Sequence, residues 1–344
     1  MKKVLIVLLA LIIDASCKKS DVPPKNEEVL APIEKVNLIV PENLKDPVKQ
    51  QGDPLYNVIG YGYDVTGKFN DASSIRGNVI DIAAYVKGEK PNNFVPWRGT
   101  AGWHDSYDAV NAEELASKLS AESEETKNKN LFGATMTEFF PQTTAFSEKY
   151  VYGYYSHYFQ YRLFRFWIDE EIIAKFRKYL NPLFQSDVQN LSPEMIVQKY
   201  GTQVLGNIKL GAKLDIVYQA EIGVNNRSDL QQNGYDAAIK RTFGLWTNRL
   251  NEIDSIKLRK IKSPALSFRV AGGDPSRLKI IKTPNGPWVD LNDWLNSIDT
   301  QNYAFIQADS TIPLFSFITD ETKRSAVQAY IASYLESRKV KLTK

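Results

Sequence analysis

The sequence predicts an α+β fold built around one unusually long β-strand. From Ile208 to Val224, apolar and polar residues alternate almost without interruption. Side chains of a strand point alternately to its two faces, so this run indicates a strand well beyond the usual length of about five or six residues. Other segments repeat their apolar residues at helical spacing and begin with good capping residues. Within the long strand, Gly211 has no Cβ and is a natural place for a sharp bend.

The amino terminus has the order of a secretory signal: two lysines, an apolar run, and small residues before the single cysteine. These are Lys2 and Lys3, residues 4–13, and Ala15, Ser16 and Cys17. We predict a lipoprotein signal peptide over residues 1–16 and a lipid on Cys17, because a single exported cysteine cannot form an internal disulfide. The alternative is a cleaved signal followed by an incidental cysteine. We expect an exported protein, a lipoprotein of the outer membrane or cell surface that is either retained or released.

Residues 17–54 are rich in Lys, Glu and Pro, and the prolines forbid a long helix, so we predict a semi-extended tether. The folded body is expected over residues 55–344. It opens with YNVIGYGYDVTG, in which Gly60 and Gly62 stand among aromatic and β-branched residues, as at a bulge or a close backbone approach. Residues 150–167 carry aromatic residues on both faces, which predicts a strand covered on two sides.

Three helices are predicted from their end signals. The signals are Asn111 with Glu114, Ser192 and Pro193 with a stop at Gly201, and Thr319 or Asp320. Each places a capping side chain or a proline just before an apolar stripe, where the first backbone N–H groups of a helix need acceptors.

Composition and residue types argue against several functions. The 43 basic and 40 acidic side chains give a formal charge of only +3, so no nucleic-acid partner is expected. His104 and His157 are the only histidines and Cys17 is assigned to lipid, which argues against a zinc site or a cysteine protease. His104 next to Asp105 could form a catalytic dyad, but the chain has no GxSxG motif, and we expect a partly exposed loop histidine. We therefore predict no enzyme, with no catalytic residue, metal or cofactor.

Several short stretches together resemble the membrane attack complex/perforin (MACPF) family. The stretch that resembles its signature consists of Tyr200, Gly201, Thr202, Gln203, Gly211 and Ala212. In the family a histidine stands at the position of Gln203 and a second glycine at that of Ala212. IGYGYD at 59–64 resembles the opening strand of the family, and WLNSI at 294–298 with the closing helix resembles the end of the domain. AGGDPSRL resembles a late turn of the family, formed here by Gly272, Gly273 and Asp274.

The resemblance covers about residues 55 to 340 and implies a strongly bent, four-stranded antiparallel sheet flanked by two helical clusters. It also implies that the clusters can unfurl into amphipathic β-hairpins and that many copies close a ring. The partners would then be other copies of the chain and a target membrane lipid or surface glycan. A closed barrel satisfies every backbone hydrogen bond in hydrocarbon, and this chain has no second apolar run long enough to cross a membrane as a helix.

Family position places the two hairpin-forming segments at about residues 105–147 and 225–262. In the second, one apolar stripe forms if the segment is helical, and it consists of Tyr235, Ile239, Phe243, Trp246, Leu250 and Ile253. Read as a strand it also alternates, so we predict that it inserts into membranes, and the alternative is an ordinary amphipathic helix. The first carries the polar run SAESEETKNKN at 120–130, which we place at a hairpin tip because a Lys at the bilayer midplane costs about 2–4 kcal/mol.

The predicted function is that of a pore-forming lipoprotein, an antibacterial toxin against competing bacteria. The alternative is a non-lytic surface lipoprotein of the same fold that acts in adhesion or glycan binding, which the polar first segment and the departures at Gln203 and Ala212 favour. If Gly211 is the bend, Gly211→Val should harm the fold more than Gly223→Val, because a β-branched residue opposes sharp bending.

Overall fold

A computed structural model of the chain describes residues 34–42, 44, 52–92, 94–223, 227–247, 255–299 and 302–343. The predicted signal peptide, Cys17 and much of the predicted tether lie outside the described residues. The strands are β1 (Asn37–Ile39), β2 (Tyr61–Tyr63), β3 (Ile75–Asn78), β4 (Phe94–Ala109), β5 (Tyr150–Phe166), β6 (Gln203–Glu221), β7 (Lys262–Ala271), β8 (Lys279–Thr283), β9 (Gly286–Asp290) and β10 (Ala304–Pro313).

The α-helices are α1 (Ile82–Glu89), α2 (Ala112–Ser120), α3 (Ala134–Thr137), α4 (Glu170–Phe176), α5 (Pro182–Asn190), α6 (Pro193–Tyr200), α7 (Arg227–Phe243), α8 (Ser255–Leu258), α9 (Asn292–Asn296) and α10 (Glu321–Ser337). Short 3₁₀ helices are η1 (Ala72–Ser74), η2 (Arg177–Tyr179), η3 (Pro275–Arg277) and η4 (Leu314–Phe317).

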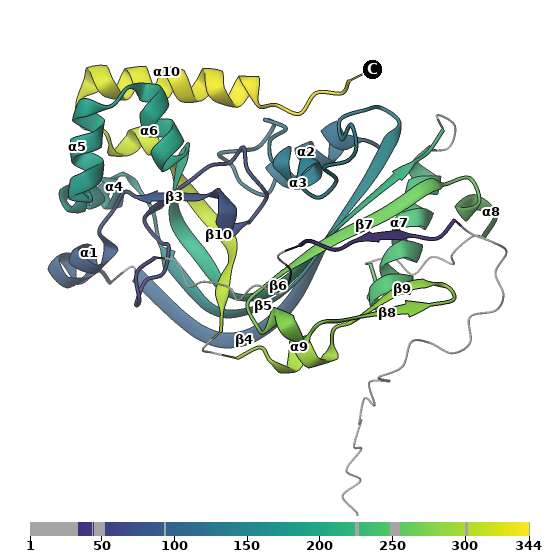
Figure 1. Ribbon diagram of the computed structural model, residues 1–344. Helices are drawn as coiled ribbons and strands as arrows, with labels where there is room; N and C mark the ends of the chain where they lie inside the picture. Colours follow the sequence, from purple (N-terminus) through teal and green to yellow (C-terminus); the bar gives the residue numbers. More distant parts are fainter. Residues whose placement is uncertain are drawn as a thin grey trace, which may run out of the picture.

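Eight strands form one curved sheet, and β8 with β9 forms a separate hairpin. The centre of the sheet is four long antiparallel strands, β4, β5, β6 and β7, as the resemblance implied. Four further strands extend it beyond the implied number: β10 and β2 pair with β6, β3 pairs with β2, and β1 pairs in parallel with β7. Because β1 spans residues 37–39, part of the stretch predicted as tether is a strand of the sheet. Figure 1 shows α2 and α3 on the concave side of the curved strands and α7 on the other side.

The 19-residue strand β6 changes its partner at its bend. Residues 203–211 pair with β10, and residues 213–221 pair with β7. At the same level β5 has an extra residue between Gln160 and Arg162, and β4 has an irregularity between Arg98 and Ala101. Bulges of this kind increase the twist of a strand and bend it. Their alignment across neighbouring strands places the bend of the whole sheet beside Gly211.

Nearly the whole length of β6 is buried on both faces. Beyond the bend its apolar face, which includes Leu214 and Ile216, belongs to the core that contains α7. Before the bend, Ile208 and Leu210 belong to the other core. Its polar face carries Lys213, Asp215 and Gln219, and these side chains are buried as well. The predicted alternation is therefore present, but the polar residues face a second layer of protein rather than water.

The predicted helix ends are confirmed. The side chains of Asn111, Ser192 and Asp320 each accept a hydrogen bond from the first turn of α2, α6 and α10. The cap of α10 is thus Asp320 rather than Thr319. Gly201 follows the last residue of α6 with φ of 76°, a conformation that glycine adopts without strain.

Candidate membrane-inserting region

The bend is built around Gly211, where β5 and β6 lie too close for a side chain. A Cβ at Gly211 would lie 1.8 Å from the backbone oxygen of Phe159. Gly272 approaches from β7, and a Cβ there would lie 2.4 Å from the oxygen of Gly211 and 3.0 Å from the Cα of Ala212. Gly272 and Gly273 have φ of 69° and 66°, which favours glycine at both. The fold thus brings the signature residues 211–212 against the late Gly-Gly turn.

The late turn is anchored to α9. The indole N–H of Trp294 donates to the oxygen of Gly272 at 3.0 Å, and the backbone N–H of Asp274 donates to Ser297 Oγ at 2.8 Å. The Asp274 carboxylate also accepts from the N–H of Ser276 at 3.1 Å and so caps η3. The predicted turn at residues 272–274 therefore joins the bend of the sheet to α9.

Signature residues 200–202 connect α6 to β6, at the opposite end of the long strand from α7. The buried Tyr200 donates its hydroxyl proton to Asp187 Oδ2 at 2.5 Å. The N–H of Thr202 donates to the oxygen of Tyr63 in β2 at 3.0 Å. Gly62 lies so close that a Cβ there would be 1.9 Å from the oxygen of Tyr200, which confirms the predicted close approach. The other two signature residues here are Gly201, which follows α6, and the buried Gln203, which is the first residue of β6.

Helix α7, which lies between β6 and β7 in the sequence, packs on the apolar face of the central sheet. Tyr235, Ile239 and Phe243 of the predicted stripe are buried in this contact. The helix ends at Phe243, so Trp246 lies beyond it and is 59% exposed, with the amine of Lys240 4.4 Å from the centre of its ring. The helix therefore ends before the predicted stripe does, and Leu250 and Ile253 of that stripe lie outside the described residues.

Three side chains spaced four residues apart on α7 bind backbone oxygens spaced two residues apart on β5. The Arg227 guanidinium donates a hydrogen bond to the backbone oxygen of Tyr150 at 2.6 Å. The Gln231 amide donates to that of Tyr152 at 2.7 Å, and the Tyr235 hydroxyl donates to that of Tyr154 at 3.0 Å. Four helical residues rise about 6 Å and two strand residues about 6.6 Å, so the two repeats match. This ladder of hydrogen bonds and the buried stripe hold the segment in its helical form. Neither Arg227 nor Gln231 was predicted from the sequence.

We expect Arg227→Met to loosen α7 selectively. Arg227 also donates to the oxygens of Val110 at 2.6 Å and Ile222 at 3.2 Å, so the change removes charge-assisted hydrogen bonds while keeping an apolar stem. Amide hydrogen exchange in α7 should accelerate, with a local opening free energy lower by about 2–3 kcal/mol. Lys240→Met is the matched control, since the Lys240 amine overlies the exposed ring of Trp246. Equal exchange in the two variants would show that Arg227 does not hold the helix.

The first predicted segment packs on the opposite face of the sheet. Strand β4 continues to Ala109, so the segment starts later than the predicted position of about residue 105. Leu115 and Leu119 of α2 are fully buried, and Gln219 of β6 donates a side-chain hydrogen bond to Thr143 Oγ1 at 3.2 Å. The polar run at 120–130 begins with Ser120, the last residue of α2, and otherwise forms turns. The two predicted segments thus cover the two faces of one sheet.

A buried ion cluster lies on the polar face beneath the first segment. Asp215 accepts hydrogen bonds from two Arg269 nitrogens at 2.9 and 3.0 Å and from Ser156 Oγ at 2.7 Å. The amine of Lys213 lies 2.9 Å from the Asp215 carboxylate, and Arg269 also pairs with Asp71. Buried charges persist only when they are paired and hydrogen-bonded. The sequence offered one sign of this cluster. Lys213 and Asp215 share a face of β6, and β6 lies next to β5, the strand that was predicted to be covered on both faces.

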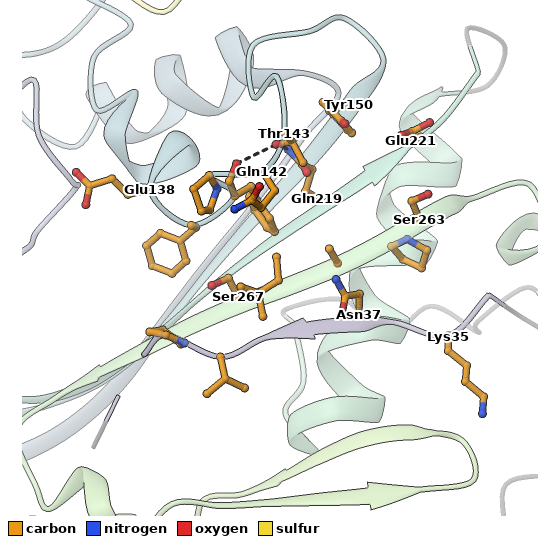
Figure 2. Close-up of a pocket in the computed structure, with 18 of the residues that line it drawn as sticks. Lys35, Asn37, Glu138, Gln142, Thr143, Tyr150, Gln219, Glu221, Ser263 and Ser267 are labelled. Atoms are coloured by element: carbon orange, nitrogen blue, oxygen red, sulfur yellow. Dashed lines mark hydrogen bonds between the residues drawn. The ribbon is translucent and has the colours of Figure 1, made fainter. Parts of the chain in front are cut away.

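A trough of about 750 Å³ opens on the same face. Figure 2 shows a loop with Gln142 and Thr143 on one side, Asn37 of β1 on the other, and Ser267 of β7 between them. Its lining mixes amide, hydroxyl and carboxylate groups with aromatic side chains. This composition suits a polar side chain with an aromatic body or a small polar ligand.

His104 lies in strand β4 rather than in a loop, which corrects the prediction. Neighbouring residues of a strand point to opposite faces, so His104 and Asp105 do not form a dyad. His104 instead lies across from His157 of β5, with ring centres 6.5 Å apart. Within the described ranges, no group of three or more His, Cys, Asp or Glu side chains could hold a metal ion. The described helices also include none that is long and apolar enough to cross a membrane.

Comparison with known proteins agrees with this architecture. The sequence profile of the MAC/Perforin domain matches residues 107–341. A MAC/perforin-domain protein from Bacteroides thetaiotaomicron has a similar structure, with a TM-score of 0.66 and 18% identity over 88% of this chain and 62% of its own. GNIP1Aa from Chromobacterium piscinae gives a TM-score of 0.58 and 15% identity over 82% of this chain and 56% of its own. The chain thus spans less than two thirds of either relative, and the likeness concerns the fold. No curated protein sequence matches the chain.

Proposed function

Because the chain belongs to the MAC/perforin family, we propose that it forms pores by assembling into rings and inserting β-hairpins from its two helical segments into a target membrane. It acts without catalysis, as an exported lipoprotein anchored through Cys17 and directed against competing bacteria. Its partners are other copies of the chain and a membrane lipid or surface glycan of the target cell.

One observation carries this proposal: each helical segment forms the connection between two strands that pair with each other in antiparallel fashion. The first joins β4 to β5 and the second joins β6 to β7, and each is about 40 residues long. A membrane strand of a barrel needs about 9–11 residues, so each connection has enough chain for two such strands. Straightening a segment would lengthen both of its flanking strands in register. The sheet would then continue into the membrane without any change of strand order.

The second segment suits this transition better than the first. Its stripe of Tyr235, Ile239 and Phe243 is already apolar and needs only a new apolar surface to cover it. The first segment must carry its polar run, residues 120–130, across the membrane at the tip of the hairpin. That run is the observation that favours the second candidate function, a surface lipoprotein of the same fold that binds a glycan or a neighbouring cell without lysis.

Leakage from dye-loaded vesicles tests the proposal. The mature lipidated protein should release dye from vesicles of bacterial outer-membrane lipid extract, and rings should be visible on the vesicles by electron microscopy. Release should rise more steeply than linearly with protein concentration, because a ring needs many copies. Binding to a glycan array or to vesicles, with no release from any lipid mixture, would instead support the non-lytic function.

A further inference from the structure

The part of the chain that follows α10 packs on the first predicted segment, residues 105–147. Residues 338–343 continue outside any helix, and Figure 1 shows them passing from the end of α10 toward the side of the molecule that carries α2 and α3. Val340 is buried in the same core as the apolar residues of α2, and Leu342 packs against that core. Lys341 between them is exposed. We call residues 339–343 the strap; its apolar side chains face the protein and Lys341 faces outward.

Three backbone hydrogen bonds join the strap to two places in and beside the first segment. The N–H of Val340 donates to the oxygen of Asn130, the last residue of the polar run, at 2.9 Å. The N–H of Thr343 donates to the oxygen of Phe146 at 2.8 Å, and the N–H of Glu148 donates to the oxygen of Thr343 at 3.3 Å. The strap therefore spans the second half of the segment, from the end of the polar run to the start of β5.

The side chain of Val340 fills a site that the segment leaves open at Gly133. A Cβ at Gly133 would lie 3.1 Å from Cγ2 of Val340 and 3.0 Å from the ring of Phe146. Val340 is only 1% exposed in this position. The strap is thus packed into the segment with a buried side chain, in addition to its backbone hydrogen bonds.

The turn that the strap covers has an unusual backbone. Asn128, Asn130 and Phe132 have φ of 63°, 50° and 65°, in the left-handed region. Asparagine tolerates this region, but a bulky residue such as phenylalanine adopts it only where its surroundings enforce it. Phe132 is buried with its ring edge-on to Phe69 at 5.1 Å between centres. This turn would relax if the segment straightened, so contacts from outside the segment are needed to keep it wound.

We propose that residues 339–343 are an autoinhibitory strap that keeps the first segment folded against the body until the strap detaches. The restraint follows from the contacts of the single chain, whereas its role in inhibition rests on the proposed pore formation. It adds a step to that function, because the first hairpin cannot form while the strap is in place.

The lengths involved show why the strap cannot travel with the segment. Helix α10 is fixed to the body by its buried face, which consists of Val327, Ile331 and Leu335. Val340 lies three residues beyond Ser337, the end of that helix, and three residues reach at most about 10 Å. In the proposed hairpin the polar run and the residues next to it cross the hydrocarbon, a distance of about 30 Å. The contacts of Val340 with Asn130 and Gly133 must therefore break before insertion.

A disulfide across this contact tests the inhibition. In mature lipidated protein carrying Gly133→Cys and Val340→Cys, the two Cβ atoms lie no more than about 4.6 Å apart, close to the upper end of the usual disulfide range at about 4.5 Å. Once free thiols are lost, the oxidised protein should leak dye at least about tenfold more slowly than the reduced protein. Val340→Cys alone is the control and should respond to neither oxidant nor reductant. Equal leakage of the oxidised and reduced double variant would overturn the strap.

Amide hydrogen exchange tests the restraint without any membrane. Val340→Ala should accelerate exchange in residues 131–148 about tenfold, because it empties the site beside Gly133. Val327→Ala removes the same groups from a buried valine in the first half of α10, and it should leave exchange in residues 131–148 unchanged. If the two variants exchange equally there, the strap does not hold the segment, whether or not the protein forms pores. If exchange responds as expected but unmodified protein never leaks, the strap is a structural restraint and the proposed pore formation is wrong.

Discussion

Gly211→Val is expected to lower the free energy of unfolding by about 3 kcal/mol, whereas Gly223→Val should leave it nearly unchanged. A Cβ at position 211 would lie 1.8 Å from the oxygen of Phe159 and 3.2 Å from the Cα of Gln160. These are backbone atoms, which cannot rotate aside as the end of a flexible side chain can. Strands β5 and β6 would have to separate at the bend. At Gly223 no described atom lies within 4 Å of the added Cβ.

Thermal and denaturant unfolding of the two variants measure this difference, because both receive the same side chain at a glycine of the same region. A loss of about 3 kcal/mol corresponds to a decrease in Tm of roughly 6–10 °C. Gly211→Ala should be nearly as harmful as Gly211→Val, since the clash begins at the Cβ. A harmless Gly211→Ala would show that β-branching, the reason suggested by the sequence, decides the outcome. Equal stability of the two valine variants would contradict the hinge at Gly211.

Local chemistry explains what the sequence predicted well. The caps Asn111, Ser192 and Asp320 act on backbone groups within their own first turns, so nearby residues suffice to identify them. The alternation along β6 likewise depends on the pleat of a single strand. The opening strand and the late turn were placed by their resemblance to the family. Gly62 and Gly272 in them lie where backbones touch and leave no room for a Cβ.

Features that depend on distant partners could not be predicted in this way. The alternation in β6 shows that Lys213 and Asp215 share a face, but their burial depends on Arg269 and on Asp71, which is far away in the sequence. Strand β1 has only three residues, which is too short for a periodic signal, and it lies in a proline-rich stretch. Its pairing with β7 could therefore not be predicted. Strand β3, which has four residues, was missed for the same reason.

The candidate inserting segment, residues 225–262, shows both what a local pattern predicts and what depends on distant partners. The stripe of Tyr235, Ile239 and Phe243 was visible at helical spacing, because one face of a helix repeats within the sequence. The helix end at Phe243 was missed, although Gly244 follows it directly. The ladder from Arg227 and Gln231 to β5 required knowing which strand lies beneath the helix and in which register.

A disulfide between α7 and β5 should abolish leakage in the oxidised protein and restore it on reduction. The pair is Gly153→Cys with Tyr235→Cys. A Cβ at Gly153 would lie 2.7 Å from the Cγ of Tyr235, so the two Cβ atoms lie no more than about 4.2 Å apart, below the upper end of the usual disulfide range at about 4.5 Å. The bond would fix the centre of α7 to a strand that stays in the sheet. Oxidised protein should leak at least about tenfold more slowly than reduced protein, because one covalent bond blocks a step that every inserted copy must take.

The Tyr235 side chain is lost in both redox states, so the comparison of oxidised with reduced protein isolates the effect of the disulfide. A second disulfide, Trp97→Cys with Leu163→Cys, serves as the matched control. These two residues face each other across β4 and β5, strands that remain paired when the helices unfold, so oxidation there should not slow leakage. If the oxidised α7 variant leaks as fast as its reduced form, α7 does not leave the sheet, and the pore must be built from other parts of the chain. If both disulfides block leakage equally, the central sheet itself must rearrange, and a barrel formed by simple strand extension would be wrong.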